Sequence, residues 1–379
     1  MRILHTSDWH LGKVLFERSL LGDQRQVLDR IVEIAASEPY DLLVVAGDVF
    51  DRCIPPEEAV VELGRWLTTI RDAAPALPVV IIAGNHDSGA RLAWSSGLLA
   101  RAGVHVRGDV GDLEVPVRIR TPEGEFAEVW PLPFLWPGAL SHAGEEAPGQ
   151  ASAFAAAIAA IRTRQTPGHT QVLVAHCFTA GSTPSDSERV LVGQAAHVDP
   201  ALLEGFDYAA LGHLHRTQQA APNAWYSGSL MPYAFSEVDA PKAILSVEAR
   251  AGRRPEVVPH RLQPPRAMRV LTGELEDLLV SPVYEPFRDD YLLVVLTRPF
   301  RVGQPMALLR SRFPHVMHLL NPVETGPAGG VPNRDRTGAR EDLEADFLDF
   351  ERHLRGGPPP DEVLRAFHRI RSGLQEGTR

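Results

Sequence analysis

The sequence predicts a layered α/β protein, and three observations support that class. Short apolar runs of strand length alternate with amphipathic segments of helical period over the first two thirds of the chain. Polar residues suited to catalysis or metal binding follow several of these apolar runs directly. Hydrophobic residues make up 44% and charged residues 23% of the 379 residues, which excludes a disordered or collagen-like chain. A chain of this length is expected to contain two or three domains.

The expected elements of the first domain follow from local signals. Asp23 is a plausible N-cap for the first helix. The apolar residues of that helix recur at helical spacing: Val27, Ile31, Ile34 and Ala35. Further amphipathic helices are expected at residues 57–71, 89–101 and 151–164. Strands are expected at residues 2–6, 42–46, 79–83, 115–119, 126–130, 171–175, 207–211, 225–227 and 243–247.

Prolines and glycines mark the expected domain boundaries. The segment LQPPR at 262–266 ends a first domain at residues 1–265. A small mixed unit is expected at 268–321, with a strand at 291–296 and a helix near 305–312. Residues 322–340 are rich in Gly and Pro and predict a flexible linker.

The tail at residues 341–375 predicts a helix-loop-helix. Apolar residues recur at helical spacing on both sides of GGPPP at 356–360; they include Phe347, Phe350, Leu354, Leu364, Phe367 and Ile370. Two such helices cannot bury their apolar faces alone. They could pack on the preceding small unit, but the linker before them favours docking to another protein.

Composition limits the compartment and the partners. Two cysteines, Cys53 and Cys177, cannot build a disulfide framework, and no apolar run approaches the span of a bilayer. The N-terminus lacks the apolar core of a signal peptide, so we expect a reducing, cytoplasmic location without a membrane partner. The net charge of -10 argues on its face against a polyanionic ligand. However, the acidity lies in residues 1–250, whereas residues 251–340 hold 9 acidic and 13 basic side chains.

Five polar clusters follow expected strands, where the strand ends of open α/β sheets bind ligands. They are SDWH with Asp8 and His10, GDVFD at 47–51, GNHD at 84–87, His176 after an apolar strand, and GHLH with His213 and His215. Each one alone has an ordinary structural explanation as a turn, a helix cap or a hydrogen-bonded histidine. Their joint occurrence at one crevice predicts a metal site.

The ligand types favour manganese or another borderline divalent ion over a structural zinc, because carboxylate, amide and imidazole occur without thiolate, and magnesium or another divalent metal is the alternative. Seven ligands exceed the needs of one ion. Two ions about 3.5 to 4 Å apart that share a carboxylate would use them all, and such a pair serves phosphoryl displacement.

The order D-x-H, G-D-x-x-D, G-N-H-D, lone His and G-H-x-H resembles the calcineurin-like metallophosphoesterases over residues 8–215. The resemblance implies a layered β-sandwich flanked by helices, a small α+β capping domain and the terminal helix-loop-helix. It implies a first metal site of Asp8, His10, Asp48 and His215, with Asp48 as the bridge. Asn85, His176 and His213 would complete the second site.

The same resemblance leaves His86 free of metal and implies that it is the catalytic histidine. Asp87 is then expected to orient His86. By the same resemblance, Asp51 is expected to be an acidic residue that contacts the metal ligands rather than the metal. The alternative is that Asp51 is simply a turn residue.

The segments ILHTSDWHLGK, GDVFD, GNHDS and GHLH, followed by YSGS at 226–229, resemble the branch of DNA double-strand-break repair nucleases. That resemblance implies a manganese nuclease, exonucleolytic in the 3'-5' direction on duplex ends and endonucleolytic on single strands and hairpins. It also implies an SMC-like ATPase partner held by the tail, a homodimer that forms a heterotetramer with this partner, DNA presentation by the cap, and association with the nucleoid.

Dimer contacts are expected on the helices at 57–71 and 89–101, although each of these residues could equally pack on the sheet: Leu63, Trp66, Leu67, Leu92, Trp94 and Leu98. Two rival functions remain open. A phosphoesterase for small phosphorylated substrates would share the metal site without needing a basic cap or a docking tail. A noncatalytic adaptor would not need the complete ligand set.

Overall fold

A computed structural model describes residues 1–136, 138–140, 149–185, 187–188, 197–300 and 304–322, together with 347–348, 360, 363–364 and 367–368. The chain divides into two compact units, Met1–Val323 and Glu324–Arg379. Most of the expected linker at 322–340 lies outside the described residues, and so do Phe350, Leu354 and Ile370.

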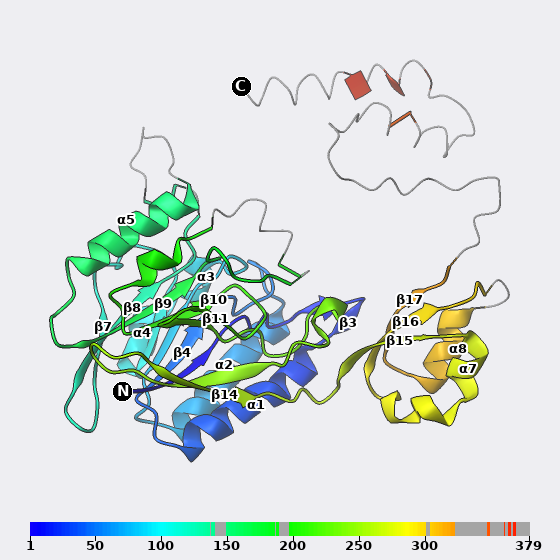
Figure 1. Ribbon diagram of the computed structural model, residues 1–379, viewed down its shortest axis with the longest axis horizontal. Coiled ribbons are helices and arrows are strands. Elements are labelled where there is room, and N and C mark those ends of the chain that lie inside the picture. The colour runs from blue at the N-terminus through cyan, green and yellow to red at the C-terminus, as the bar shows by residue number, and fades with distance from the viewer. Residues whose placement is uncertain are drawn as a thin grey trace. The chain divides into compact units, whose positions relative to one another are not determined.

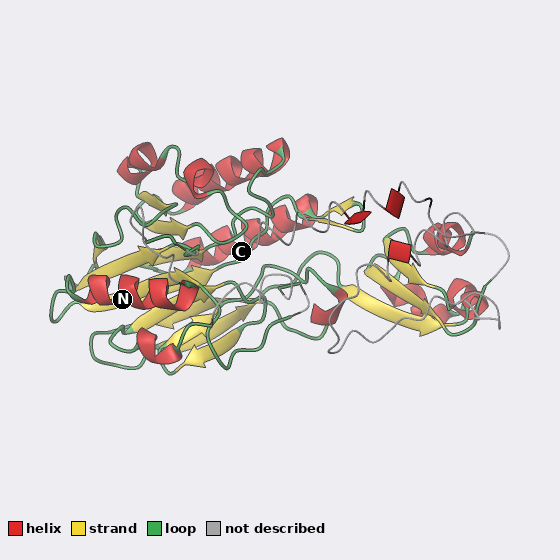
Figure 2. Cartoon of the chain, turned by 90° about the horizontal axis from the view of Figure 1, so that it is seen from above, coloured by secondary structure: helices red, strands yellow, loops and turns green. Residues whose placement is uncertain are grey.

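The larger part of the first unit is a sandwich of two six-stranded sheets, flanked by helices (Figures 1 and 2). The first sheet runs in the order β14-β13-β1-β4-β5-β6. Its strands are β14 (Glu256–Arg261), β13 (Ala243–Glu248), β1 (Arg2–Thr6), β4 (Leu42–Ala46), β5 (Val79–Ile82) and β6 (Val104–Arg107).

The second sheet runs in the order β11-β12-β10-β9-β8-β7. Its strands are β11 (Gln218–Ala221), β12 (Ala224–Tyr226), β10 (Tyr208–Gly212), β9 (Thr170–His176), β8 (Phe126–Leu132) and β7 (Val117–Arg120). Strands β1, β4, β5 and β6 pair in parallel, as do β8, β9, β10 and β12.

Alternate residues of the central strands fill the space between the two sheets. Ile3 and Val44 of the first sheet belong to one buried cluster with Val129 and Val174 of the second. Their neighbours Leu4, Leu43 and Val45 belong to a different cluster on the outer face. Because successive side chains of a strand point to opposite faces, both faces of these strands are buried, which explains their runs of consecutive apolar residues.

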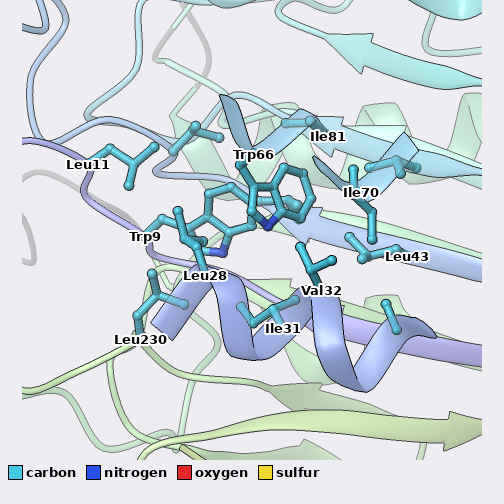
Figure 3. Packing of buried hydrophobic residues seen from close by; sticks show 14 of the residues in the cluster. Trp9, Leu11, Leu28, Ile31, Val32, Leu43, Trp66, Ile70, Ile81 and Leu230 are labelled. Carbon is cyan, nitrogen blue, oxygen red and sulfur yellow. The ribbon is translucent and has the colours of Figure 1, made fainter. Parts of the chain in front are cut away.

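Helices α1 (Leu21–Ser37) and α2 (Glu57–Ala73) cover the outer face of the first sheet. Figure 3 shows Trp66 of α2 beside Trp9, with ring centroids 4.7 Å apart at 75°. Both indoles are fully buried, and truncating a buried tryptophan to alanine typically costs about 3 to 5 kcal/mol. This contact fixes α2 against the loop that follows β1.

Helix α5 (Gln150–Arg162) covers the outer face of the second sheet, with the short helix η1 (Pro200–Leu203) beside it. Its buried side chains Phe154, Ile158 and Ile161 pack on residues of β9 and β10. Cys177 lies buried in this same cluster, as expected for a core thiol, and burial raises its pKa to about 12.

The small unit after the sandwich has three parallel strands, β15 (Met268–Gly273), β16 (Tyr291–Leu296) and β17 (Val316–Leu320). Helix α7 (Leu275–Val280) and η3 (Pro282–Phe287) connect the first two, and α8 (Pro305–Arg312) precedes the third. Leu278, Leu292 and Phe313 lie in its own core. The expected mixture of strands and helices is confirmed, but the parallel pairing makes this unit α/β in connectivity rather than α+β.

A hydrogen-bonded ion pair and an apolar cluster join the small unit to the sandwich. Arg266 donates to Asp23 of α1 at 2.5 Å, and Tyr291 lies in one buried cluster with Leu20 and Tyr233. The expectation that Asp23 caps α1 is wrong, because the helix begins two residues earlier, at Leu21. Leu20 is buried at that point, and the carboxylate of Asp23 is used for the distant arginine instead.

The expected helix at 89–101 is two short helices, α3 (Gly89–Leu92) and α4 (Ser96–Arg101). The sequence SSG at 95–97 consists of weak helix formers, which accounts for the break. A two-stranded hairpin, β2 (Val14–Leu15) and β3 (Arg18–Ser19), follows the first motif.

None of the helices in the described ranges is long and apolar enough to cross a membrane. In the second unit, the rings of Phe347 and Phe367 stack with centroids 4.2 Å apart at 7°.

Candidate metal centre

The candidate ligands lie beyond the carboxyl ends of five parallel strands. Asp8 and His10 follow β1, Asp48 follows β4 and Asn85 follows β5, all from the first sheet. His176 ends β9, and His213 and His215 follow β10, both from the second sheet. The sandwich therefore brings together all seven residues that the sequence suggested, although they come from two sheets.

The backbone at this crevice is strained. Asp8, His10, Asp48 and His213 have positive φ values of 52°, 47°, 49° and 106°. Non-glycine residues rarely adopt this conformation, and such strain clusters at functional sites. Four of the six described non-glycine residues with positive φ are thus candidate ligands.

Glycines precede the ligands because neighbouring backbone segments approach closely here. A Cβ on Gly84 would lie 2.3 Å from the backbone nitrogen of Asp48, and one on Gly212 would lie 1.9 Å from the carbonyl oxygen of Ala46 in the other sheet. Only glycine fits such contacts with backbone, which explains why the motifs G-N-H-D and G-H-x-H begin with it.

Asp8, His10 and His215 form the first group, with ligand atoms within 4.8 Å of one another. The Nε2 atoms of His10 and His215 lie 3.1 Å apart. Ser7 donates to Asp8 Oδ2 at 2.5 Å, and the backbone N–H of His213 donates to Asp8 Oδ1 at 3.0 Å. These bonds orient the carboxylate toward the two imidazoles.

Asp48, Asn85, His176 and His213 form the second group. Asn85 Oδ1 lies 3.0 Å from His176 Nε2 and 2.9 Å from His213 Nδ1. Asp48 Oδ2 lies 3.4 Å from His176 Nε2 and 3.6 Å from His10 Nε2 of the first group. This one oxygen therefore faces both groups, as a bridging ligand must.

The protonation pattern of these side chains fits a bound cation. His176 Nδ1 donates to the carbonyl of Ala46 at 2.8 Å, so in the neutral ring Nε2 directs its lone pair at Asn85 Oδ1, itself an acceptor. Asn85 Nδ2 and His213 Nε2 are buried and have no hydrogen-bond partner among the described residues. Acceptors that face one another in a buried site need positive charge between them.

The electrostatics of the metal-free site also indicate a need for positive charge. Burial would lower the pKa of His176, but the charge of Asp48 outweighs it and raises this pKa to about 9. Burial raises the pKa of Asp8 to about 6. Without a metal, a proton on His176 thus supplies part of the charge that a divalent ion would supply.

His86 stands beside the ligands. Its Nδ1 donates to the carbonyl of Asp51 at 2.9 Å, so Nε2 is the ring nitrogen that this hydrogen bond does not use. Its backbone N–H donates to Asp48 Oδ1 at 2.8 Å, and its half-buried ring packs edge-on against His10, with centroids 4.7 Å apart.

The expectation that Asp87 orients the His86 ring needs correction. The Asp87 carboxylate accepts the backbone N–H groups of Val49, Phe50 and Gly84 at 2.9 to 3.0 Å. It therefore holds together the loops after β4 and β5, and the carbonyl of Asp51 orients the ring.

The carboxylate of Asp51 lies behind the first group. It accepts from Lys13 at 2.8 Å and lies 3.5 Å from His10 Nδ1. Burial opposes ionisation, but the contacts with His10 and Lys13 prevail and hold the pKa of Asp51 well below its usual value.

Two residues at this site were missed by the sequence reasoning. Glu237 and Lys242 are buried behind His215 and contact its ring and its backbone. Their one sequence signal is that Lys242 and Lys13 are the only lysines beside 36 arginines.

Comparisons with known proteins identify the family of this chain. The family model of the calcineurin-like phosphoesterases matches residues 1–217. SbcD of the nuclease SbcCD from Staphylococcus saprophyticus is 31% identical over 327 residues, which cover 85% of this chain and 85% of the relative. A crystal structure of a dimetal phosphatase from Danio rerio is 12% identical and covers 68% of this chain and 98% of its own, with a TM-score of 0.36, too low to add support for the fold. The chain belongs to the calcineurin-like phosphoesterase family, in the group of the SbcD nucleases.

Proposed function

We propose that this chain is a metal-dependent DNA nuclease that hydrolyses phosphodiester bonds. The observation that carries the proposal is that seven candidate ligand side chains lie together in one crevice, with His86 beside them. The relationship to a nuclease directs this chemistry toward DNA.

Two divalent ions, manganese in our proposal, occupy the centre. Asp8, His10 and His215 hold the first, while Asn85, His176 and His213 hold the second. Asp48 bridges them, a role supported by its single oxygen that faces both groups. When bound, such a pair activates water and stabilises the charge of the phosphate in the transition state.

His86 acts on the phosphodiester itself. Because Asp51 fixes its Nδ1 proton, Nε2 is directed to the substrate and can stabilise the phosphate or protonate the leaving oxygen. Asp87 keeps the two loops that carry Asp48 and His86 in register.

The proposed activities are 3'-5' exonucleolytic on duplex ends and endonucleolytic on single strands and hairpins, in repair, recombination and replication of DNA. The small unit at 268–321 acts as a cap that presents DNA. Its support is the basic balance of residues 251–340, which comes from the segments on either side of this unit, since phosphate contacts supply most nonspecific affinity.

The tail at 341–375 docks an SbcC-like SMC ATPase. The contact between the stacked rings of Phe347 and Phe367, two apolar residues from either side of GGPPP, supports this proposal. Leu364 belongs to the same proposed surface, and Phe350, Leu354 and Ile370 are proposed from their spacing alone.

A homodimer forms through α3 and α4, and with two ATPase subunits it makes a heterotetramer. Trp94 and Leu98 support this interface, because they are 80% and 69% exposed. Trp66 and Leu92 are buried against the sheet, and Leu63 and Leu67 are partly buried on the same core, so the alternative of packing on the sheet applies to these four and we leave them out of the proposed interface.

A substrate panel tests the proposal. The full chain with manganese is incubated with linear duplex, hairpin and single-stranded DNA and, separately, with a phosphomonoester. We expect metal-dependent cleavage of the DNAs at rates well above that of the monoester. Turnover of the monoester alone would instead support a phosphoesterase of small substrates.

A further inference from the structure

A buried ion pair lies behind His215. The Lys242 ammonium donates to Glu237 Oε2 at 2.7 Å, and the two residues are 3% and 0% exposed. Burying two charges is costly unless further hydrogen bonds satisfy them. Each member of this pair also contacts His215.

Glu237 contacts the imidazole of His215. Its Oε1 lies 3.1 Å from His215 Nδ1, and Ser187 Oγ lies 2.8 Å from the same nitrogen and donates to Glu237 at 2.5 Å. A carboxylate can only accept, so His215 carries its proton on Nδ1. The neutral ring then presents the Nε2 lone pair to the crevice, where Nε2 of His10 lies 3.1 Å away.

Lys242 holds the backbone of the same residue. Its ammonium donates to the His215 carbonyl at 2.8 Å and to Ser229 Oγ at 2.9 Å. Together with the bond to Glu237, these contacts use all three donors of the ammonium. The ring and the carbonyl of His215 are thus both held by one buried pair.

The choice of lysine is informative in this chain. Only Lys13 and Lys242 are lysines among 38 basic residues. A compact ammonium directs three donors to three separate acceptors, whereas the guanidinium of arginine is a larger, planar fork. Three acceptors around one buried nitrogen suit lysine, and arginine would not fit without displacing them.

We infer that Glu237 and Lys242 are positioning residues that fix the tautomer and direction of His215 for metal binding. This inference rests on the proposed metal site and deepens it. Partners of this kind behind a metal-bound histidine typically change metal affinity about 10- to 100-fold.

The test measures manganese binding by electron paramagnetic resonance titration of the full chain. The double variant Glu237→Gln/Lys242→Met removes both charges, so that neither is left buried without a partner. Glu62→Gln is the matched control, because Glu62 is another fully buried carboxylate, paired with Arg25 and Arg65 on the outer side of the sandwich. Thermal unfolding without metal reports whether each variant folds.

We expect the double variant to fold as the control does but to bind one of the two ions about 10- to 100-fold more weakly, with the other ion retained. Lys242→Arg keeps the charge and should show the same weaker binding of one ion. This variant replaces the double variant in the test if the double variant does not fold. Two ions bound with wild-type affinity in a folded variant would overturn the positioning role and leave the proposed function intact. A wild-type chain that binds no pair of ions would contradict the proposed function itself.

Discussion

The geometry of His86 separates catalysis from metal binding at the scale of single residues. Its contact with Asp48 is made by the backbone N–H, which a substitution of the side chain preserves. Its ring is oriented by a backbone carbonyl and contributes no ligand atom to the two proposed ion sites.

We therefore predict that His86→Ala retains both manganese ions and DNA binding but loses cleavage by about 10²- to 10⁴-fold, the usual contribution of an acid–base group. Single-turnover cleavage with metal stoichiometry in parallel measures this. His105→Ala, on the edge strand β6, is a matched control that should cleave normally. Loss of bound manganese in His86→Ala would assign that residue to the ligands instead.

His5 predicts a pH dependence of stability. It lies fully buried on β1, 2.8 Å from the Tyr208 hydroxyl, and burial lowers its pKa from 6.5 to about 3. The unfolded chain binds a proton below pH 6.5 that folded His5 does not bind. The stability that neutral His5 contributes is therefore fully present above pH 6.5 and lost as the pH falls toward 3.

Urea unfolding of the metal-free chain tests this effect. Between about pH 7 and about pH 5.5, the unfolding free energy of the wild type should fall by about 1 kcal/mol more than that of His5→Gln, which keeps a polar partner for Tyr208. Parallel pH curves for the two proteins would show that His5 does not contribute.

At the scale of elements, strands with buried apolar runs could be predicted from the sequence, whereas most edge strands of the two large sheets could not. Strands β1 and β4 are confirmed at their expected bounds, because both of their faces are buried and each carries apolar residues shortly before a motif. Strand β14 was missed, since it is largely exposed and contains Pro259, as edge strands can.

The candidate site shows the same limit. The candidate ligands could be proposed from the sequence, because each cluster is local and follows an apolar strand, and three of the five clusters begin with a glycine. The contact of Glu237 and Lys242 with His215, like that of Asp23 with Arg266, depends on tertiary packing over 22 to 243 positions, which no local pattern records.

The break between α3 and α4 carries a prediction about assembly. Trp94 lies at the break and is 80% exposed, with Leu98 of α4 also exposed. A dimer through this surface would bury both, so Trp94→Glu/Leu98→Glu should give a monomer in light scattering at micromolar concentration. Val258→Asp, at an exposed apolar residue of β14, is the control and should leave the dimer intact. An unchanged mass for the double variant would place the interface elsewhere.

At the scale of the whole molecule, the net charge of -10 is compatible with DNA binding. Three of the acidic side chains, Asp8, Asp48 and Asp51, lie at the metal centre, where two divalent ions would offset them. In our proposal, DNA contacts are then local, made by the metal crevice and by the basic residues that flank the small unit.

The division into two units predicts that catalysis and partner binding separate. The metal centre lies in Met1–Val323, whereas the proposed docking tail lies in Glu324–Arg379. A chain lacking residues 341–379 should fail to co-purify with the ATPase while it still cleaves model substrates with manganese. Retained co-purification would show that the tail is not the docking element.

The central claim is a pair of ions bridged by Asp48, and anomalous diffraction from crystals grown with manganese tests it most directly. We predict two anomalous peaks about 3.5 to 4 Å apart, one beside Asp8, His10 and His215 and the other beside Asn85, His176 and His213, with Asp48 between them. Crystals of Asp48→Asn should lose both peaks or retain them only weakly. A single peak in the wild type, or two peaks that do not share Asp48, would contradict the account.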